Sequence, residues 1–152
     1  MTSPAAPPRP DIASRDHVSA LVVAFYGRAF KDELLRPIFV DVAHLDLAAH
    51  LPIMCDFWET VLFKTGAYKR NALQAHTALH ARSPLNARHF GRWLDIWTAT
   101  VDAMFAGEKA ELAKVQAARI AWSMSRRLMG ESGSEFVTIR RASDTDYSKP
   151  QN

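Results

Sequence analysis

The segment NARHFGRWLDIWTATVDAMF, residues 86–105, has the clearest helical pattern in the chain. Its apolar side chains recur three and four residues apart, so they fall on one face of an α-helix. They are Phe90, Trp93, Leu94, Trp97, Val101, Met104 and Phe105. Gly107 follows soon after, and glycine commonly ends a helix. The segment therefore predicts a long helix with a strongly aromatic buried face.

The N-terminal part of the chain shows the same helical period. A first long helix is expected to begin near Ser14, a good N-cap residue, and to bury Val18, Leu21, Val22, Phe25, Ala29 and Phe30. Tyr26 lies one residue past Phe25 and should reach the edge of this buried stripe. Pro37 is expected to end or redirect the chain, because proline disrupts a helix interior.

A second helix is expected to carry Met54, Phe57, Trp58, Val61 and Leu62. Pro52 limits where this helix can start, because proline is tolerated in a first helical turn but not in an interior. We therefore expect regular helix to begin only between His50 and Pro52, with His50 at the helix entrance.

The C-terminal part of the chain is expected to contribute the remaining helices. Asn71 is a suitable N-cap for a short helix that bears His76. The last helix, from about Lys109 to Met129, is expected to bury Leu112, Val115, Ala118, Trp122 and Met129. No segment alternates apolar and polar residues over a useful length, so we predict an all-α fold.

Composition indicates one globular domain between two unstructured ends. The chain has 152 residues, of which 48% are hydrophobic and 23% are charged, close to the average for globular proteins. Residues 1–10 are rich in proline and are expected to form a disordered arm, and residues 131–152 a flexible polar tail. The folded domain is therefore predicted to span residues 11–130.

Charge and cysteine content argue against several classes of function. The net charge of +3 comes from 19 basic and 16 acidic residues. We expect the basic residues to be scattered with acids between them, which argues against nucleic-acid binding. The lone Cys55 permits no intramolecular disulfide and is expected to be a buried, inert thiol. We find no signal peptide, membrane-spanning run, phosphate loop or nucleophile elbow, so we predict a cytoplasmic protein without a membrane partner.

Two of the six histidines share one face of the predicted short helix, because His76 and His80 lie four residues apart. A haem iron needs an axial donor, and from spacing alone His76, His80 or neither could supply it. The pair also has the spacing of a zinc-binding helix, but the glutamate of that motif is missing. The aromatic residues could equally form an ordinary core that holds no cofactor.

Five sequence elements occur in an order and with gaps that are typical of one family. They are Phe25-Tyr26, Leu35-x-Pro37-Ile38-Phe39, His50-x-x-x-Met54-x-x-Phe57-Trp58, Tyr68 with His76 eight residues later, and His89-Phe90-x-x-Trp93-Leu94. With these elements the chain resembles the truncated haemoglobins, specifically their third group, over roughly residues 11–130. The resemblance implies a shortened globin fold, in which two helices cross two others, and a bound haem b.

The resemblance also implies roles for particular residues around the iron. It makes His76 the proximal iron ligand. Tyr26 becomes the distal hydroxyl that donates a hydrogen bond to the bound ligand, and Trp93 becomes a second donor beside it. His50 becomes the distal gate, and Met54 lines the distal wall.

Further residues are implied to hold the porphyrin itself. Phe25, Trp58 and Phe90 would pack around the ring, and Arg70 could pair with a haem propionate. The chain departs from the family between Tyr68 and His76, where Lys69-Arg70-Asn71-Ala72 stands in place of the glycine and proline often found there. The loop before His76 is therefore expected to have a different shape.

These implications lead to an expected function, to one enzymatic alternative, and to a third possibility, gas sensing through a partner bound by the terminal tails. We expect a haem protein that reversibly binds oxygen, or another diatomic ligand such as NO or CO, at a histidine-ligated iron with a polar distal pocket. The alternative is an enzyme that performs nitric-oxide dioxygenation or peroxide chemistry at the same iron. In that case His50 and Tyr26 would move protons, and a separate reductase would supply electrons.

Overall fold

The computed structural model describes residues 8–128, and every regular element in this range is helical. The elements are α1 (Arg15–Ala29), the π-helical turn η1 (Pro37–Val42), α2 (Leu47–Phe63), α3 (Ala72–Arg82), α4 (Ala87–Met104) and α5 (Glu108–Leu128). The all-α prediction is therefore confirmed. None of the helices within residues 8–128 has the length and apolarity needed to cross a membrane.

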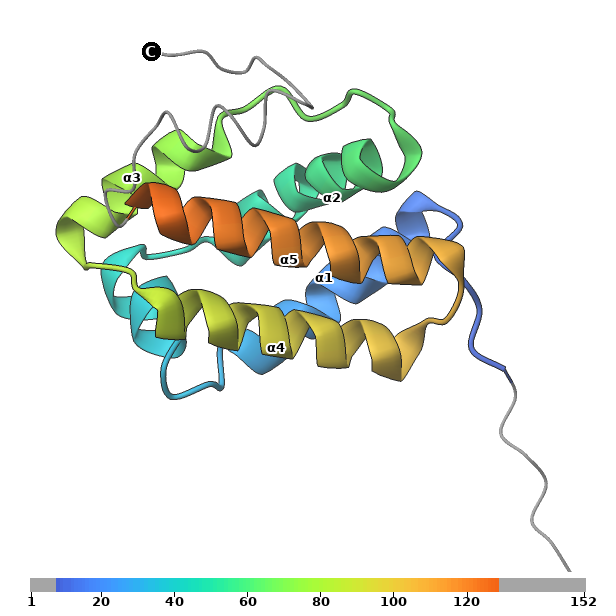
Figure 1. The fold of residues 1–152 in the computed structure, drawn as a ribbon, viewed down its shortest axis with the longest axis horizontal. Helices are drawn as coiled ribbons and strands as arrows, with labels where there is room; N and C mark the ends of the chain where they lie inside the picture. Colours follow the sequence, from blue (N-terminus) through green and yellow to red (C-terminus); the bar gives the residue numbers. More distant parts are fainter. Residues whose placement is uncertain (1–7, 129–152) are drawn as a thin grey trace, which may run out of the picture.

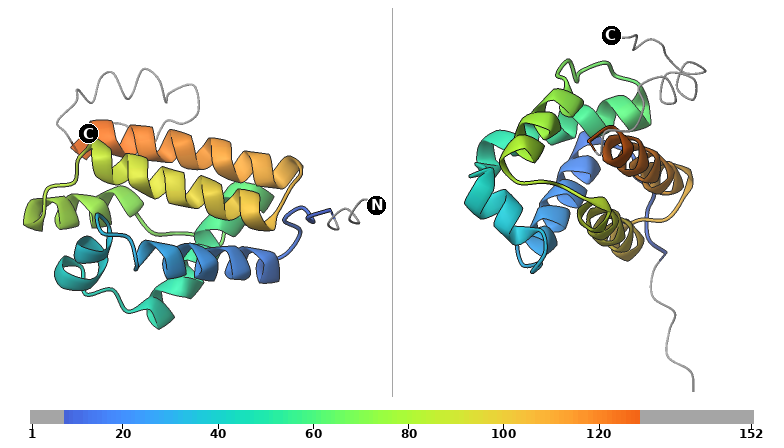
Figure 2. Two further views of the ribbon diagram at one scale, coloured as in Figure 1. Left: turned by 90° about the horizontal axis from the view of Figure 1, so that it is seen from below. Right: turned by 60° about the vertical axis from the view of Figure 1, so that its left-hand side comes forward.

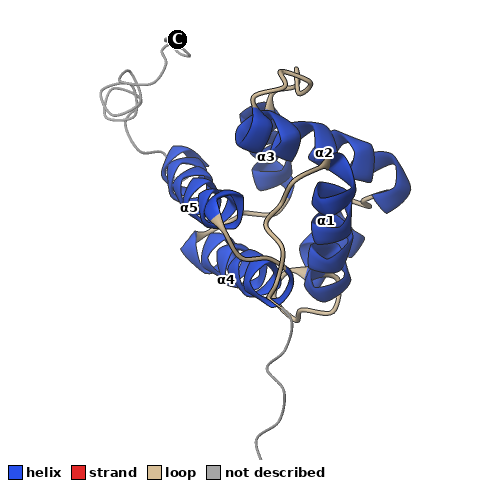
Figure 3. Ribbon diagram, turned by 90° about the vertical axis from the view of Figure 1, so that its right-hand side faces the viewer, coloured by secondary structure: helices blue, strands red, loops and turns tan. Residues whose placement is uncertain are grey.

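The helices form two packed pairs and one outlying helix. α4 and α5 lie side by side and run in opposite directions (Figure 1). α1 packs against α2 to form the second pair, and it also packs against α4 (Figures 2 and 3). α3 lies at one end of the molecule, where its main contact is with α5. This arrangement leaves α3 less enclosed than any other helix.

The first helix matches its prediction closely. The Ser14 hydroxyl accepts a hydrogen bond from the His17 N–H at 3.3 Å, so Ser14 caps α1. The predicted apolar stripe is buried, with the exception of Phe30, which is half-buried. Pro37 begins η1, in which the Ala43 N–H donates to the carbonyl five residues earlier. This wide turn redirects the chain, as predicted.

The second helix begins earlier than predicted. The Asp46 carboxylate accepts a hydrogen bond from the Ala49 N–H at 3.3 Å and caps α2 at Leu47. Pro52 therefore lies inside α2, and His50 is the fourth residue of the helix rather than its entrance. The helix tolerates this proline because only the carbonyl of Ala48 loses its partner, and Ala48 is exposed to water.

The last helix turns a different face to the core than predicted. Its buried residues are Ala110, Ala113, Ala117, Ala121, Ser125 and Leu128. Val115 and Trp122, which were expected to be buried, are 46% and 52% exposed. Small side chains allow α4 and α5 to approach closely, and the Trp97 indole N–H donates to the Ala113 carbonyl across this contact at 3.2 Å. Close packing of the two backbones thus outweighs the burial of two larger apolar side chains.

The N-terminal segment caps the last helix, although almost a hundred residues separate them. The Asp11 carboxylate accepts hydrogen bonds from the N–H groups of Lys109 and Ala110 at 2.9 and 2.8 Å. Desolvation would raise the pKa of Asp11, but these backbone hydrogen bonds, together with one from Ile12, outweigh it and lower the pKa. The carboxylate therefore stabilises the start of α5.

The two terminal predictions fall largely outside the described residues. Residues 1–7 of the expected arm, the whole expected tail, and Met129 and Gly130 at the expected helix end all lie there. Among the described residues of the arm, Pro10 accepts a hydrogen bond from the Ala106 N–H at 2.9 Å. The domain boundaries remain predictions.

Gly107 permits the contact between Asp11 and α5, and its replacement should be costly. Its φ is +138°, and a Cβ on this residue would lie 2.5 Å from the Asp11 Cγ. We expect Gly107→Ala to lower the free energy of unfolding by about 2–4 kcal/mol, through backbone strain and steric overlap. Gly91→Ala is the matched control: it lies in α4 with open space around it, and should raise stability by about 0.5–1 kcal/mol. Urea unfolding of both variants tests this, and a Gly107→Ala variant as stable as the parent would contradict it.

Candidate haem site

His76 on α3 has a geometry that suits a metal ligand. Its ring Nδ1 lies 2.8 Å from the Ala72 carbonyl oxygen, one helical turn earlier. Because a carbonyl oxygen can only accept a hydrogen bond, Nδ1 carries the proton, and in the neutral ring Nε2 keeps a free lone pair. A backbone carbonyl that orients the ring in this way is the usual support for a metal-ligating histidine. The His76 residue is half-buried, and no described residue forms a hydrogen bond with its Nε2.

The other histidines of the chain have different surroundings. The Nδ1 atoms of His17, His80 and His89 each accept a hydrogen bond from a backbone N–H group. In the neutral ring this arrangement places the proton on Nε2 and leaves no free lone pair there. His44 is exposed, and His50 pairs with a tyrosine. Of the two candidates left open by spacing, geometry therefore favours His76 over His80.

Tyr26 and His50 form a polar pair across the α1–α2 contact. The Tyr26 hydroxyl lies 2.8 Å from the His50 Nε2. Tyr26 is 6% exposed, and burial raises the pKa of its hydroxyl, which keeps the phenol protonated at physiological pH. His50 is half-buried, and its pKa is lowered by desolvation and by the positive charges of His76 and Arg70. His50 is consequently held in its neutral form.

The charges that lower the pKa of His50 come from two other parts of the chain. The charges of His76, on α3, and of Arg70, in the loop before it, both act on the His50 ring, on α2. Arg70 likewise opposes the rise in pKa that burial causes at Tyr68. His76 and Arg70 therefore lie within electrostatic range of His50. The structure does not test what Arg70 would bind.

Trp93 of α4 is linked to Tyr26 through the ring of Phe25. Its ring lies 6.0 Å from the Phe25 ring and stacks parallel to Trp97 at 6.2 Å. Phe25 in turn contacts Tyr26 edge-on at 5.0 Å. Trp93 is half-buried, and no other described residue accepts a hydrogen bond from its indole N–H. The indole therefore has a donor available for a ligand or for water.

The side chains expected around a porphyrin fall into two groups. Phe25 and Trp58 are 2% and 3% exposed and belong to the main core, where Trp58 stacks on Trp97 at 4.4 Å. Phe90 is instead half-buried, in a smaller cluster that includes Leu73 of α3. Phe90 is thus better exposed than Phe25 or Trp58 to contact a flat apolar group.

Two aromatic residues near the polar pair were not predicted as part of the site. The rings of Phe30 and Phe39 lie 5.8 and 5.7 Å from the Tyr26 ring. Both residues were expected to have only a core role or none, and Phe39 reaches Tyr26 because η1 turns the chain back toward α1. Phe30 follows Tyr26 by four residues, a helical spacing that could have predicted its contact, whereas no such spacing relates Phe39 to Tyr26. Together Phe30 and Phe39 shield the phenol from water.

The described residues fit a flat apolar cofactor better than a bare metal ion. α3 buries none of its residues, although it carries Leu73 and Leu79 beside His76. On α2, Met54 and Phe57 are also only half-buried. Apolar side chains left partly uncovered beside a free imidazole are what a haem pocket requires. Within residues 8–128, no cluster of three or more His, Cys, Asp or Glu side chains could hold a metal, so the zinc alternative finds no support there.

The geometry predicts opposite tautomers for two histidines on one helix. We expect His76 to carry its proton on Nδ1 and His80 to carry it on Nε2, at a pH where both rings are neutral. Long-range ¹H–¹⁵N correlation spectra of the haem-free or ferrous-CO protein report this directly, with His76→Gln and His80→Gln variants to assign the signals. A His76 ring protonated on Nε2 alone would contradict the geometry on which the ligand assignment rests.

The fold can be compared with solved structures. A crystal structure of group III truncated hemoglobin from Campylobacter jejuni matches the chain with a TM-score of 0.69 and 22% sequence identity. The match covers 79% of this chain and 94% of that chain. No family model and no curated protein sequence matches the chain. The similarity concerns the fold, and it confirms the shortened globin fold that the sequence predicts.

Proposed function

We propose that this chain is a haem protein of the truncated haemoglobin family, group III, that reversibly binds oxygen or another diatomic ligand. The observation that carries the proposal is the hydrogen bond from the His76 Nδ1–H to the Ala72 carbonyl, within a fold shared with a group III truncated hemoglobin. The neighbourhood of His50, Tyr26 and Trp93 supports it. The cofactor we infer is haem b.

His76 would hold the iron through Nε2. The hydrogen bond to Ala72 fixes the orientation of the ring and increases the electron density that Nε2 can donate. The short helix α3 has no buried residue of its own, so a bound cofactor would add the apolar contacts that this helix lacks. When bound, the haem would supply an iron with an open position for a diatomic ligand.

Tyr26 and Trp93 would stabilise a ligand that develops negative charge. The phenol stays protonated because its pKa is raised by burial, and the indole N–H of Trp93 is a permanent donor. A hydrogen bond to a charged acceptor contributes about 1.5–3 kcal/mol. The two donors would therefore hold oxygen tightly and favour it over CO, which carries less charge.

His50 would decide how freely Tyr26 can donate. When His50 is protonated on Nδ1 alone, its Nε2 accepts the hydrogen bond of 2.8 Å that the Tyr26 hydroxyl donates. When Nε2 carries the proton, the imidazole donates to the phenol oxygen, and the phenol proton is free to reach a ligand. His50 would thus act as the distal gate through its tautomer as well as its position.

The Tyr26–His50 pair also favours a second candidate function. A phenol and a half-buried imidazole in hydrogen-bond contact can pass a proton between a ligand and solvent. Nitric-oxide dioxygenation or peroxide chemistry would use such a pair, with electrons from a separate reductase. Turnover separates the two candidates, because a carrier forms a stable oxygen complex whereas a dioxygenase consumes NO. The reductase and the cytoplasmic location remain predictions.

The identity of the iron ligand is tested with a cavity variant. We expect the purified protein to show a haem absorption spectrum, and His76→Gly to lose it or to regain it only when imidazole is added, because free imidazole can occupy the vacated position. His80→Gly is the control, and it should keep the spectrum. A wild-type protein that stays colourless and takes up no added haemin would overturn the proposed function.

The distal hydrogen bond is tested by ligand release. We expect Tyr26→Phe to speed oxygen dissociation roughly tenfold to a hundredfold, which corresponds to the loss of about 1.5–3 kcal/mol. Carbon monoxide dissociation should change less, because CO accepts a weaker hydrogen bond. Stopped-flow measurements on the ferrous protein give both rates. Equal changes for the two ligands would indicate altered access to the pocket rather than a lost hydrogen bond.

A further inference from the structure

Basic residues are concentrated in one part of the sequence, contrary to our expectation that they are scattered. Residues 60–94 contain six Lys and Arg and no Asp or Glu. The remaining 117 residues contain 13 basic and 16 acidic residues, so they carry a net negative charge. The two parts together give the whole chain a net charge of only +3. The prediction of interspersed charge was therefore wrong for this segment.

The structure gathers this charge around α3. Lys64, Lys69 and Arg70 lie in the loop that precedes α3, Arg82 ends the helix, and Arg88 lies in the first turn of α4. We call these five residues the α3 basic surface. All five are exposed, and none forms a salt bridge with another described residue. In Figures 1 and 2, α3 lies at the edge of the fold, away from the N-terminal end of the described chain.

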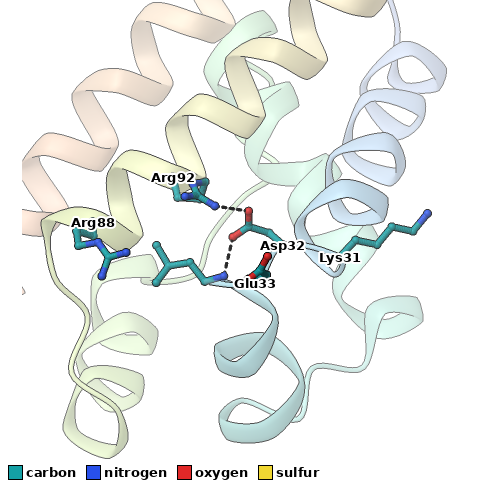
Figure 4. Close-up of a pocket in the computed structure, with 6 residues that line it drawn as sticks. Lys31, Asp32, Glu33, Arg88 and Arg92 are labelled. Atoms are coloured by element: carbon teal, nitrogen blue, oxygen red, sulfur yellow. Dashed lines mark hydrogen bonds and ion pairs between the residues drawn. The ribbon is translucent and has the colours of Figure 1, made fainter.

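Arg88 forms no salt bridge with another described residue, even though carboxylates lie nearby. It lines an open cavity of about 440 Å³ with Lys31, Asp32, Glu33, Leu34 and Arg92 (Figure 4). Asp32 is fully engaged, because one oxygen binds Arg92 at 2.5 Å and the other accepts two backbone N–H groups. Glu33 is the one other carboxylate on this wall, and it has no salt bridge to Arg88. The α3 basic surface therefore ends in a cationic, partly concave region.

We propose that the α3 basic surface docks an acidic electron-transfer protein, one that carries a flavin or an iron–sulfur cluster. The inference rests on the proposed function, in which α3 holds the iron through His76. A donor seated on this surface would face the helix of the proximal ligand. In the reaction, the donor loses one electron and a ferric haem iron gains it to become ferrous. No proton or bond needs to move.

The shape of the surface favours a compact protein over other anionic partners. The eleven residues of α3 span about 16 Å, so the charges at its two ends are spaced for a protein–protein interface. Residues 60–94 contribute no large exposed hydrophobic side chain, of the kind that would insert into a membrane or stack on a nucleic-acid base. Complementary charge would speed the encounter and orient the partner.

The experiment measures binding of two acidic probes, a bacterial flavodoxin and a plant-type [2Fe–2S] ferredoxin, by calorimetry at low and high ionic strength. The test variant is Lys69→Glu/Arg88→Glu, with one change on each side of α3 and neither inside a helix interior. The control is Arg9→Glu/Arg119→Glu, which alters two exposed cations outside the α3 basic surface. Both variants lower the net charge by the same amount, so they separate local from global electrostatics.

We expect at least one probe to bind the parent protein, and we expect this binding to weaken when salt is added. The test variant should bind about tenfold more weakly at low ionic strength, and the control should be nearly unchanged. Equal losses in both variants, or no binding of either probe, would overturn the proposal. So would tighter binding of duplex DNA or phosphatidylserine vesicles through the same two residues.

A separate measurement distinguishes this failure from failure of the proposed function. Binding of the probes requires no haem, whereas reduction of a ferric haem by the reduced probe does. If the protein takes up no haemin, the electron-transfer role falls with the proposed function, and the binding data still decide whether the surface recognises an acidic protein. If haem is present and binding is normal but the test variant is reduced as fast as the parent, the proposal of electron transfer through this surface is wrong.

Discussion

Trp97 lies where its own helix, α4, meets three others, and the rest of the fold is arranged around it. Its ring stacks on Trp58 of α2 at 4.4 Å, contacts Phe25 of α1 at 5.5 Å, and its N–H donates to the α5 backbone at Ala113. A large indole can lie so deep only if the facing helix has small side chains, which explains the alanine face of α5. One buried side chain therefore fixes how the two helix pairs cross.

The proposed site borders this core and uses its rigidity. Trp93 stacks parallel to Trp97, and Phe25 links that stack to Tyr26. The polar pair of Tyr26 and His50 is thus held by tightly packed aromatic rings, whereas His76 stands on a helix that buries nothing. In the proposed haem protein, the cofactor would add apolar contacts to α3, which the described protein does not bury. The proposed docking of an electron donor on the α3 basic surface would bring that donor close to the helix that carries His76.

Local chemistry made much of the fold predictable. Ser14, Asn71 and Asn86 each cap a helix through their side chains, and the apolar stripes of α1 and α4 follow the helical period. Helical period alone was insufficient for α5, because a stripe of alanines next to a stripe of larger residues gives two possible buried faces. Pro52 led us to predict too late a start for α2. A proline in the second turn of a helix costs little when the carbonyl that it leaves unpaired is exposed to water.

The sequence by itself determined the all-α class, the order of the helices and the residue types that a haem site needs. Only the tertiary structure decided that Tyr26 meets His50, that Asp11 caps α5 and that Arg88 lies beside the carboxylates of Asp32 and Glu33. The physical reason is the range of the interactions. Capping and helical period act over a few residues, whereas hydrogen bonds between helices and the field of a charged surface depend on how distant segments pack.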